Sequence, residues 1–266
     1  MTDDEILVLG PGGTVGRRVV ARLRATGSEV RPASRSTPVR FDWASPGTWQ
    51  PALADATAMF LMAPDGVPVE PELCTLAARA GVRRVVLLSS RAIEAMGDDR
   101  LLAAERAVRD GGTEWTIVRA DWFDQNFDEG FLRPAVEAGA VAIPVGGVRQ
   151  TFVDAGDIAA VVVAALTDDG HAGVTHEVTG PEAITFGEAC AIVGTACGRE
   201  VRFEGTEEAY RTAMSSFGVP EAQIARDVAA FTALAAAGDS APRDTVERVT
   251  GHPPRRFADY AAGASW

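Results

Sequence analysis

The chain has 266 residues, a hydrophobic content of 47% and a formal net charge of -12. This length and apolar content allow a large buried core. The acidic balance disfavours nucleic acid and anionic membrane as partners, because phosphate groups have to be met by clustered Lys or Arg. No apolar run approaches the roughly eighteen residues of a membrane span. The start, Met-Thr-Asp-Asp-Glu, lacks the basic region of a signal peptide, so we expect a cytoplasmic protein without a membrane segment.

A glycine-rich turn follows the first apolar run. Residues 5–16 read Glu-Ile-Leu-Val-Leu-Gly-Pro-Gly-Gly-Thr-Val-Gly, and a helical apolar pattern continues from there. The order is that of a strand, a turn and a helix start. Glycines let backbone N–H groups approach a pyrophosphate that the positive end of the helix faces. We therefore predict a dinucleotide cofactor site formed by Gly10, Gly13, Thr14, Val15 and Gly16.

The second predicted strand, residues 29–32, leads into Ala-Ser-Arg-Ser with no carboxylate. At this place an acidic residue would accept from a free ribose 2′-hydroxyl, whereas an arginine would pair with a 2′-phosphate. Arg35 therefore predicts that NADP(H) is preferred over NAD(H). Arg17 and Arg31 either add contacts to that phosphate or are solvated surface residues.

Short apolar segments alternate with helical ones through the rest of the first half. The pattern predicts strands at 40–42, 58–62, 84–88 and 114–119, and helices at 70–80 and 100–110. This indicates an α/β, Rossmann-type, doubly wound parallel sheet with helices on both faces. Ligands of such sheets bind beyond the carboxyl ends of the strands. We therefore expect one crevice to be lined by Gly10, Ala63, Pro64, Ser89, Ser90 and residues 120–126, with Ala63, Pro64 and Ser89 on the cofactor.

The second half keeps strands at 150–153 and 175–179 around a helix at 157–166 that Asp157 caps. Beyond Gly180-Pro181 the pattern becomes mainly helical, with helices at 186–197, 207–215 and 221–236 and a short strand at 201–204. We assign residues 1–150 to an NAD(P)-binding Rossmann domain. Residues 151–266 are expected to contribute to the sheet and then to form a smaller, mainly helical subdomain that covers the substrate.

The sequence contains no lysine, and its only tyrosines are Tyr210 and Tyr260. A Tyr-x-x-x-Lys proton relay and Schiff-base chemistry are therefore excluded. Arginine cannot replace the lysine as a titrating group because it stays charged at physiological pH. The three cysteines and three histidines lack the spacing of metal ligands, so no metal site is expected.

Several segments together resemble one family. They are the opening Gly-x-x-Gly-x-x-Gly, residues 81–90, the helix that carries Glu105, residues 115–119, 122–127, 152–159 and 179–181, and the last stretch 246–257. In these segments the chain resembles the NmrA-like branch of atypical short-chain dehydrogenases/reductases. The resemblance implies NAD(P)H binding. Members include quinone reductases, isoflavone-type reductases, reductases of alkaloid iminium intermediates and NADPH-binding regulators without catalysis.

The chain departs from that pattern after the strand at 114–119. Where the family usually has Arg-Pro-Gly/Ser-Trp-Phe, this chain reads Arg-Ala-Asp-Trp-Phe, and Asp124 follows where an apolar or small residue is common. A carboxylate beside the nicotinamide can move a proton or stabilise a cationic substrate if burial shifts its pKa. The alternative is a solvated loop aspartate or a helix cap. Asp121 and Asp124 are thus candidate catalytic residues.

Ser90 is the third catalytic candidate, because its hydroxyl can orient a substrate oxygen. Without a tyrosine and a lysine beside it, lining the cofactor pocket is the alternative role. The resemblance also implies a set of residues around the nicotinamide and the substrate, although aromatic side chains at such spacing can equally belong to the core. This set is Trp122, Phe123, Asn126 and Phe152.

These features favour an NADPH-dependent oxidoreductase that acts on a small molecule, and secondary metabolism is one setting compatible with them. Its acceptor is expected to be electrophilic already, as a quinone, an iminium ion or a conjugated enone is, because an ordinary ketone needs a positioned acid. Two alternatives remain open. One is a redox-neutral isomerase or cyclase of a biosynthetic pathway with Asp121 as acid/base. The other is a non-catalytic NADP(H)-sensing regulatory protein. Neither the substrate's identity nor the oligomeric state is predicted.

Overall fold

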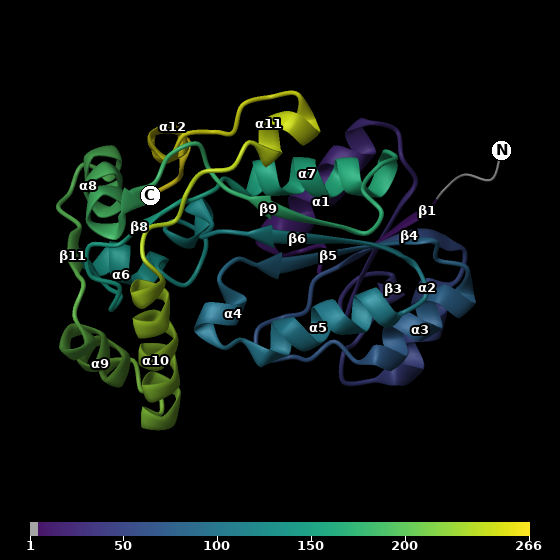
Figure 1. Cartoon of the computed structure of the whole chain (residues 1–266), viewed down its shortest axis with the longest axis horizontal. Helices are drawn as coiled ribbons and strands as arrows, with labels where there is room; N and C mark the ends of the chain where they lie inside the picture. The colour runs from purple at the N-terminus through teal and green to yellow at the C-terminus, as the bar shows by residue number, and fades with distance from the viewer. Residues whose placement is uncertain (1–4) are drawn as a thin grey trace.

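The computed structural model describes residues 5–266, and its centre is a seven-stranded parallel sheet in the order β3-β2-β1-β4-β5-β6-β9 (Figure 1). The order reverses between β1 and β4, which makes the sheet doubly wound. This is the Rossmann-type α/β fold that the sequence predicts. The strands are β1 (Glu5–Leu9), β2 (Val30–Ser34), β3 (Val39–Arg40), β4 (Ala56–Leu61), β5 (Arg84–Ser90), β6 (Glu114–Ala120) and β9 (Val174–Val178).

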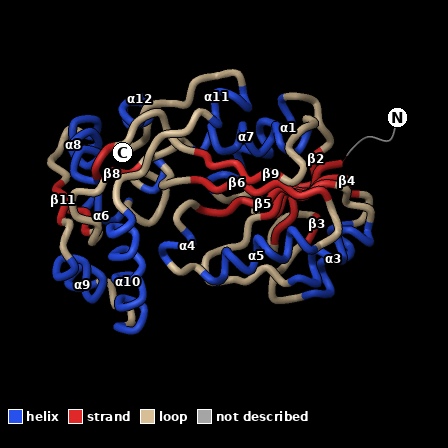
Figure 2. Tube along the Cα trace, in the orientation of Figure 1, coloured by secondary structure: helices blue, strands red, loops and turns tan. Residues whose placement is uncertain are grey.

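Helices cover both faces of the sheet (Figures 1 and 2). Alternate residues of a strand serve opposite faces: Val86 packs with one layer of helices and Leu87 with the other. Strands buried on both sides read as continuous apolar runs, which is why they are visible in the sequence. One layer holds α1 (Thr14–Ala25), α7 (Ala155–Thr167) and α11 (Thr245–Thr250), and the other α2 (Trp49–Leu53), α3 (Pro71–Ala80) and α5 (Asp99–Asp110).

The remaining elements form a smaller, mainly helical region at the left of Figure 1. Its core is aromatic, and in it Phe127, Phe152, Phe186 and Phe257 contact one another. This region lies beyond the carboxyl ends of β5, β6 and β9, where a substrate is expected. Its elements are α6 (Arg133–Ala138), β7 (Ala140–Ala142), β8 (Arg149–Gln150), β10 (Ile184–Thr185), α8 (Phe186–Cys197), β11 (Arg202–Glu204), α9 (Glu207–Ser216), α10 (Glu221–Ala237) and α12 (Phe257–Gly263), with the short α4 (Ile93–Met96) facing α10.

Two local predictions were wrong. The residue that caps α7 is Asp154, whose carboxylate accepts from the N–H of Gly156 at 2.6 Å, and Asp157 lies within the first turn of the helix. The strand predicted at 150–153 is shorter than expected: only Arg149–Gln150 pairs, with β10, and Val153 makes an isolated bridge to Phe123. Both errors concern the ends of elements. Within a few residues of sequence, a loop residue cannot be told from a strand residue, nor one aspartate from another as the helix cap.

The expectation of no signal peptide rests on the acidic start of the sequence. Residues 1–4 of that start lie outside the described residues. Between residues 5 and 266 there is no helix with both the length and the apolarity to cross a membrane.

Candidate cofactor and active site

The glycine turn between β1 and α1 is built for close approach of strand and helix. Gly10 has φ +71°, in the left-handed region that favours glycine. A Cβ atom on Gly16 would lie 2.1 Å from the carbonyl oxygen of Gly10, so no other residue fits there without moving the backbone. The turn is closed by a hydrogen bond from the N–H of Gly13 to the same oxygen, at 3.1 Å.

The first turn of α1 is open to an anion. Its N-cap is Gly13, no side chain of the described residues caps it, and no acidic residue occupies that turn. The N–H groups of a helix start carry partial positive charge and need acceptors. Thr14, Val15 and Gly16 therefore fit the pyrophosphate of a dinucleotide, as the sequence predicts.

A small hydroxyl-rich turn follows β2. Thr37 Oγ1 accepts from the N–H of Ser34 at 2.7 Å, and Ser34 Oγ accepts from the N–H of Ser36 at 3.2 Å. Arg35, between them, is exposed and makes no ion pair with any residue from 5 to 266. Its guanidinium is available to a phosphate at the place where the ribose 2′-position is expected.

The two other arginines considered for that phosphate have partners within the chain. Arg17 forms an ion pair with Glu129, which also pairs with Arg18 at 2.8 Å. Arg31 forms an ion pair with Glu5, at the start of β1 and hence at the opposite edge of the sheet. The structure therefore favours Arg35 for the phosphate contact.

Ala63 and Pro64 follow β4 at the same edge of the sheet as the glycine turn. The neighbouring Met62 lies against that turn, with its Cε 3.4 Å from where a Cβ of Gly13 would be. The side chains beside the predicted cofactor site are thus small or flexible. Both candidate cofactor residues keep positions compatible with their predicted role.

The two serines at the end of β5 point to opposite faces. Ser89 is buried, and its hydroxyl donates to Glu105 Oε1 at 2.8 Å; Glu105 is fully buried and accepts two more hydrogen bonds, both of 2.7 Å, from Arg119. Burial alone would raise the pKa of Glu105, but the hydrogen bonds from Arg119 and Ser89 outweigh it and hold the pKa below its usual range. This position favours a structural role for Ser89 over a cofactor contact. Ser90 is half-buried and its hydroxyl contacts only the carbonyl of Arg91, at 3.1 Å, so it remains available to a ligand.

Asp121 lies at the end of β6, and its carboxylate is fully engaged. Oδ1 accepts from the N–H of Trp122 at 2.9 Å. Oδ2 accepts from Arg91 at 2.8 Å, from Ser240 at 2.9 Å and from Thr151. A carboxylate with four donors and 8% exposure is poorly placed to take a proton from a substrate.

Asp124 is fully buried, and neither of its carboxyl oxygens has a hydrogen-bond partner among residues 5–266. Burial, reinforced by the negative charges of Asp154 and Asp157, raises the pKa of Asp124 well above its usual value. Burial therefore favours the neutral carboxylic acid over the carboxylate at this position. Because the side chain has no exposed surface, this placement favours a role inside the fold over contact with a substrate.

The four residues predicted around the substrate have different surroundings. Phe152 is 2% exposed inside the aromatic core, which favours the core alternative. Phe123 packs against the helix layer of α1 and α7. Trp122 and Asn126 are half-buried, and the Trp122 ring lies 6.3 Å from that of Phe131, which is 62% exposed. Phe123 is half-buried as well, so Trp122, Phe123 and Asn126 are the members of the set that keep surface for an acceptor.

Neither tyrosine is placed as a proton donor. Tyr210 donates to Asp227 at 3.0 Å and Tyr260 to Asp128 at 2.7 Å. Burial, together with these carboxylates, raises the pKa of both phenols above the usual value. Both lie in hydrophobic clusters of the helical region.

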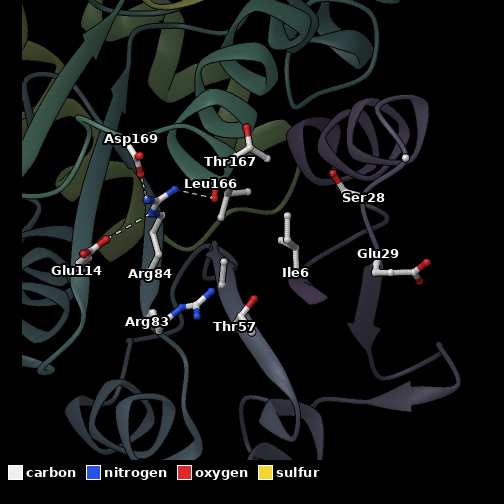
Figure 3. Close-up of a pocket in the computed structure, with 12 residues that line it drawn as sticks. Ile6, Ser28, Glu29, Thr57, Arg83, Arg84, Glu114, Leu166, Thr167 and Asp169 are labelled. Atoms are coloured by element: carbon white, nitrogen blue, oxygen red, sulfur yellow. Dashed lines mark hydrogen bonds and ion pairs between the residues drawn. The ribbon is translucent and has the colours of Figure 1, made fainter. Parts of the chain in front are cut away.

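A cavity of about 580 Å³ lies at the opposite edge of the sheet, around the starts of β1, β4, β5 and β6 (Figure 3). Arg84 at its wall is satisfied within the chain: it donates to the carbonyls of Leu166 and Asp168 at 3.0 and 2.9 Å and pairs with Asp169 at 3.3 Å. This cavity is separate from the predicted phosphate site, because the glycine turn and the start of α1 lie at the carboxyl edge of the sheet.

The fold and the glycine turn define a dinucleotide-binding Rossmann protein. A family model described as NAD(P)H-binding matches residues 10–169. The chain belongs to this NAD(P)H-binding family, as the resemblance to the NmrA-like branch of atypical short-chain dehydrogenases/reductases implies.

Curated relatives match along nearly the whole chain. The uncharacterized oxidoreductase YesF of Bacillus subtilis is 34% identical over 98% of this chain and 96% of its own length. The (4-alkanoyl-5-oxo-2,5-dihydrofuran-3-yl)methyl phosphate reductase of Streptomyces griseus is 36% identical over 97% and 96%. Among solved structures, the NADPH-dependent quinone oxidoreductase QOR2 of Escherichia coli in complex with NADPH superposes with a TM-score of 0.81 at 20% identity, covering 97% of this chain and 98% of that one, which shows the shared fold.

Sequence reasoning missed the partners that hold the candidate residues. Arg91, Thr151 and Ser240, which surround Asp121, are 30, 30 and 119 residues away from it in the chain. Such contacts leave no local pattern. The departure of Asp121 from the family pattern was the one available signal.

Proposed function

We propose that the protein is an NADPH-dependent reductase that delivers hydride to a pre-activated acceptor, such as a quinone, an iminium ion or a conjugated enone. The observation that carries this proposal is the lack of a positioned acid. The sequence has no lysine, and both tyrosines donate to aspartates in the helical region. An acceptor that is already electrophilic needs no strong acid at its oxygen.

The chain's own residues would bind the cofactor and orient the acceptor. The glycine turn and the start of α1 would hold the pyrophosphate, and Arg35 the 2′-phosphate. Ser90, Trp122 and Asn126 would face the acceptor. Bound NADPH would supply the hydride.

The activities of two relatives support an activated acceptor. The Streptomyces griseus relative reduces a dihydrofuran that carries an oxo and an alkanoyl group, and a relative from Xenophilus azovorans, 33% identical over 96% of this chain, is an NAD(P)H azoreductase. Oxo and alkanoyl groups polarise a neighbouring double bond toward hydride. The isomerase alternative loses support, because its proposed base, Asp121, is occupied by four donors within the chain.

Turnover tests the proposal directly. Purified protein is mixed with NADPH and a panel of quinones, imines and enones while the nicotinamide absorbance is followed. We expect acceptor-dependent oxidation of NADPH by at least one class. Tight NADPH binding with no oxidation across the panel would favour the sensor, and a product of unchanged oxidation state would favour the isomerase.

The cofactor preference is tested at Arg35. We expect Arg35→Glu to weaken NADPH binding by about ten- to a hundredfold and NADH binding far less, because one charge-assisted hydrogen bond contributes about 1.5–3 kcal/mol. Dissociation constants of both cofactors are compared by fluorescence titration. Arg106→Glu, an exposed site on α5 with the same charge change, is the control. Equal losses for NADPH and NADH would contradict the assignment.

A further inference from the structure

We propose that Asp121 is a positioning residue that fastens the segment 238–243, here called the strap, over the ends of β5 and β6 and so fixes helix α10 on the acceptor side of the site. The inference rests on the proposed function for the identity of that side. It gives the departure of Asp121 from the family pattern a physical role other than proton transfer.

Asp121 joins four parts of the chain that are far apart in sequence. Its Oδ2 atom accepts from Arg91, after β5, from Thr151, after β8, and from Ser240, in the strap. Arg91 also donates to Ser240 Oγ at 2.8 Å and to Thr151 Oγ1 at 3.1 Å. The side chains of Arg91 and Asp121 are only 13% and 7% exposed, so the pair is largely shielded from water.

The strap has other contacts on both sides of this cluster. The N–H of Ser240 donates to the carbonyl of Arg149 at 2.8 Å, and Asp239 accepts from the N–H of Arg149 at 2.9 Å. Further on, Arg243 donates to Glu177 in β9 at 2.7 Å and to Thr179 at 2.8 Å. The contacts through Ser240 are thus the ones that connect the strap to the ends of β5 and β6.

Helix α10 ends at Ala237, three residues before Ser240. Along the same helix, Phe231 stacks on Trp122 with ring centroids 6.0 Å apart, and α10 also packs on α4 (Figure 1). The adjacent residues Asp121 and Trp122 therefore hold α10 at two points, one through the strap and one through the aromatic stack. Because Trp122 is a candidate acceptor contact, the position of α10 sets the shape of the acceptor side.

A carboxylate suits this function better than a neutral side chain. It can accept from a guanidinium and two hydroxyls at once, and charge-assisted hydrogen bonds are roughly twice as strong as neutral ones. Removing one partner of a shielded ion pair leaves the other charge unpaired, which is strongly unfavourable. The strap is therefore held firmly as long as Arg91 and Asp121 are both present.

The test uses Ser240→Ala and Asp121→Asn in the NADPH-bound full-length protein, with Ser216→Ala as the control because Ser216 bonds only within α9, at 2.6 Å. We expect faster hydrogen exchange in residues 221–243 of both variants and not of the control. With menadione as the acceptor, we expect the acceptor KM to rise about tenfold while kcat changes less than about threefold and the NADPH dissociation constant is unchanged.

The outcomes separate the possible roles. Wild-type exchange and KM in Ser240→Ala would overturn the proposal, even if Asp121→Asn fails to fold. A kcat loss in Asp121→Asn alone, with unchanged KM and a lost limb in the pH profile, would make Asp121 a proton donor instead. If the wild type reduces no acceptor, the proposed function fails, while the exchange measurement still decides whether the strap is fastened by Asp121.

Discussion

Gly16→Ala is expected to bind NADPH about ten- to a hundredfold more weakly than the wild type and to lose about 1–3 kcal/mol of folding free energy. The added Cβ would lie 2.1 Å from the carbonyl oxygen of Gly10 and 2.9 Å from its carbonyl carbon. These are backbone atoms, so the contact is relieved only by moving the turn away from the helix start. The displaced N–H groups then no longer converge on the pyrophosphate.

Calorimetric titration with NADPH and urea unfolding measure the two effects. Gly12→Ala is the matched control for the fold, because a Cβ there would meet nothing within 4 Å and the residue has no positive φ. We expect Gly12→Ala to unfold at the same urea concentration as the wild type. A Gly16→Ala protein with wild-type affinity and stability would show that the turn does not require the close approach seen in the structure.

Asp124→Asn is expected to be stabilised relative to the wild type by an amount that grows with pH. The folded-state pKa of Asp124 is raised, so the folded protein keeps a proton that the unfolded chain has lost above about pH 4. Between the unfolded-state pKa and the raised folded-state pKa of Asp124, the wild type therefore loses about 1.4 kcal/mol of unfolding free energy for each pH unit. The variant shows no such loss, because asparagine does not titrate.

Urea unfolding of both proteins at pH 5, 6 and 7 gives the difference in free energy of unfolding directly. The titrations of Asp128 and Asp157, whose pKa values burial also raises, occur in both proteins and largely cancel. A difference that stays constant from pH 5 to pH 7 would mean that Asp124 is ionised in the folded protein. It would then need a partner that the described residues do not supply.

The fold was predictable because its signals are local. A buried parallel strand such as β5 is a run of apolar residues, and α3 is capped at its carboxyl end by Gly81, whose φ of +100° only glycine adopts easily. The glycine turn was equally visible, since strand, glycines and helix follow one another directly. Short elements such as α4 and α12 were missed because they span too few residues to show a period.

The surroundings of the candidate site residues were not predictable, because side-chain partners come from distant segments. Asp121 and Asp124 are three residues apart and look alike in sequence, yet among residues 5–266 the carboxylate of Asp121 has four donors and that of Asp124 has none. Ser89 and Ser90 are adjacent, yet the alternation of the strand sends one to Glu105 and leaves the other available. Only the packed structure distinguishes the members of each pair.

Calorimetric titration of the wild-type protein with NADPH, and separately with NADH, tests the central claim that the carboxyl edge of the sheet holds a phosphorylated dinucleotide. We expect one NADPH bound per chain, with an affinity at least about tenfold higher than that for NADH, because Arg35 has no ion-pair partner among residues 5–266 and is proposed to pair with the 2′-phosphate. No heat with either cofactor would contradict the cofactor site itself. Tighter binding of NADH would contradict the role of Arg35.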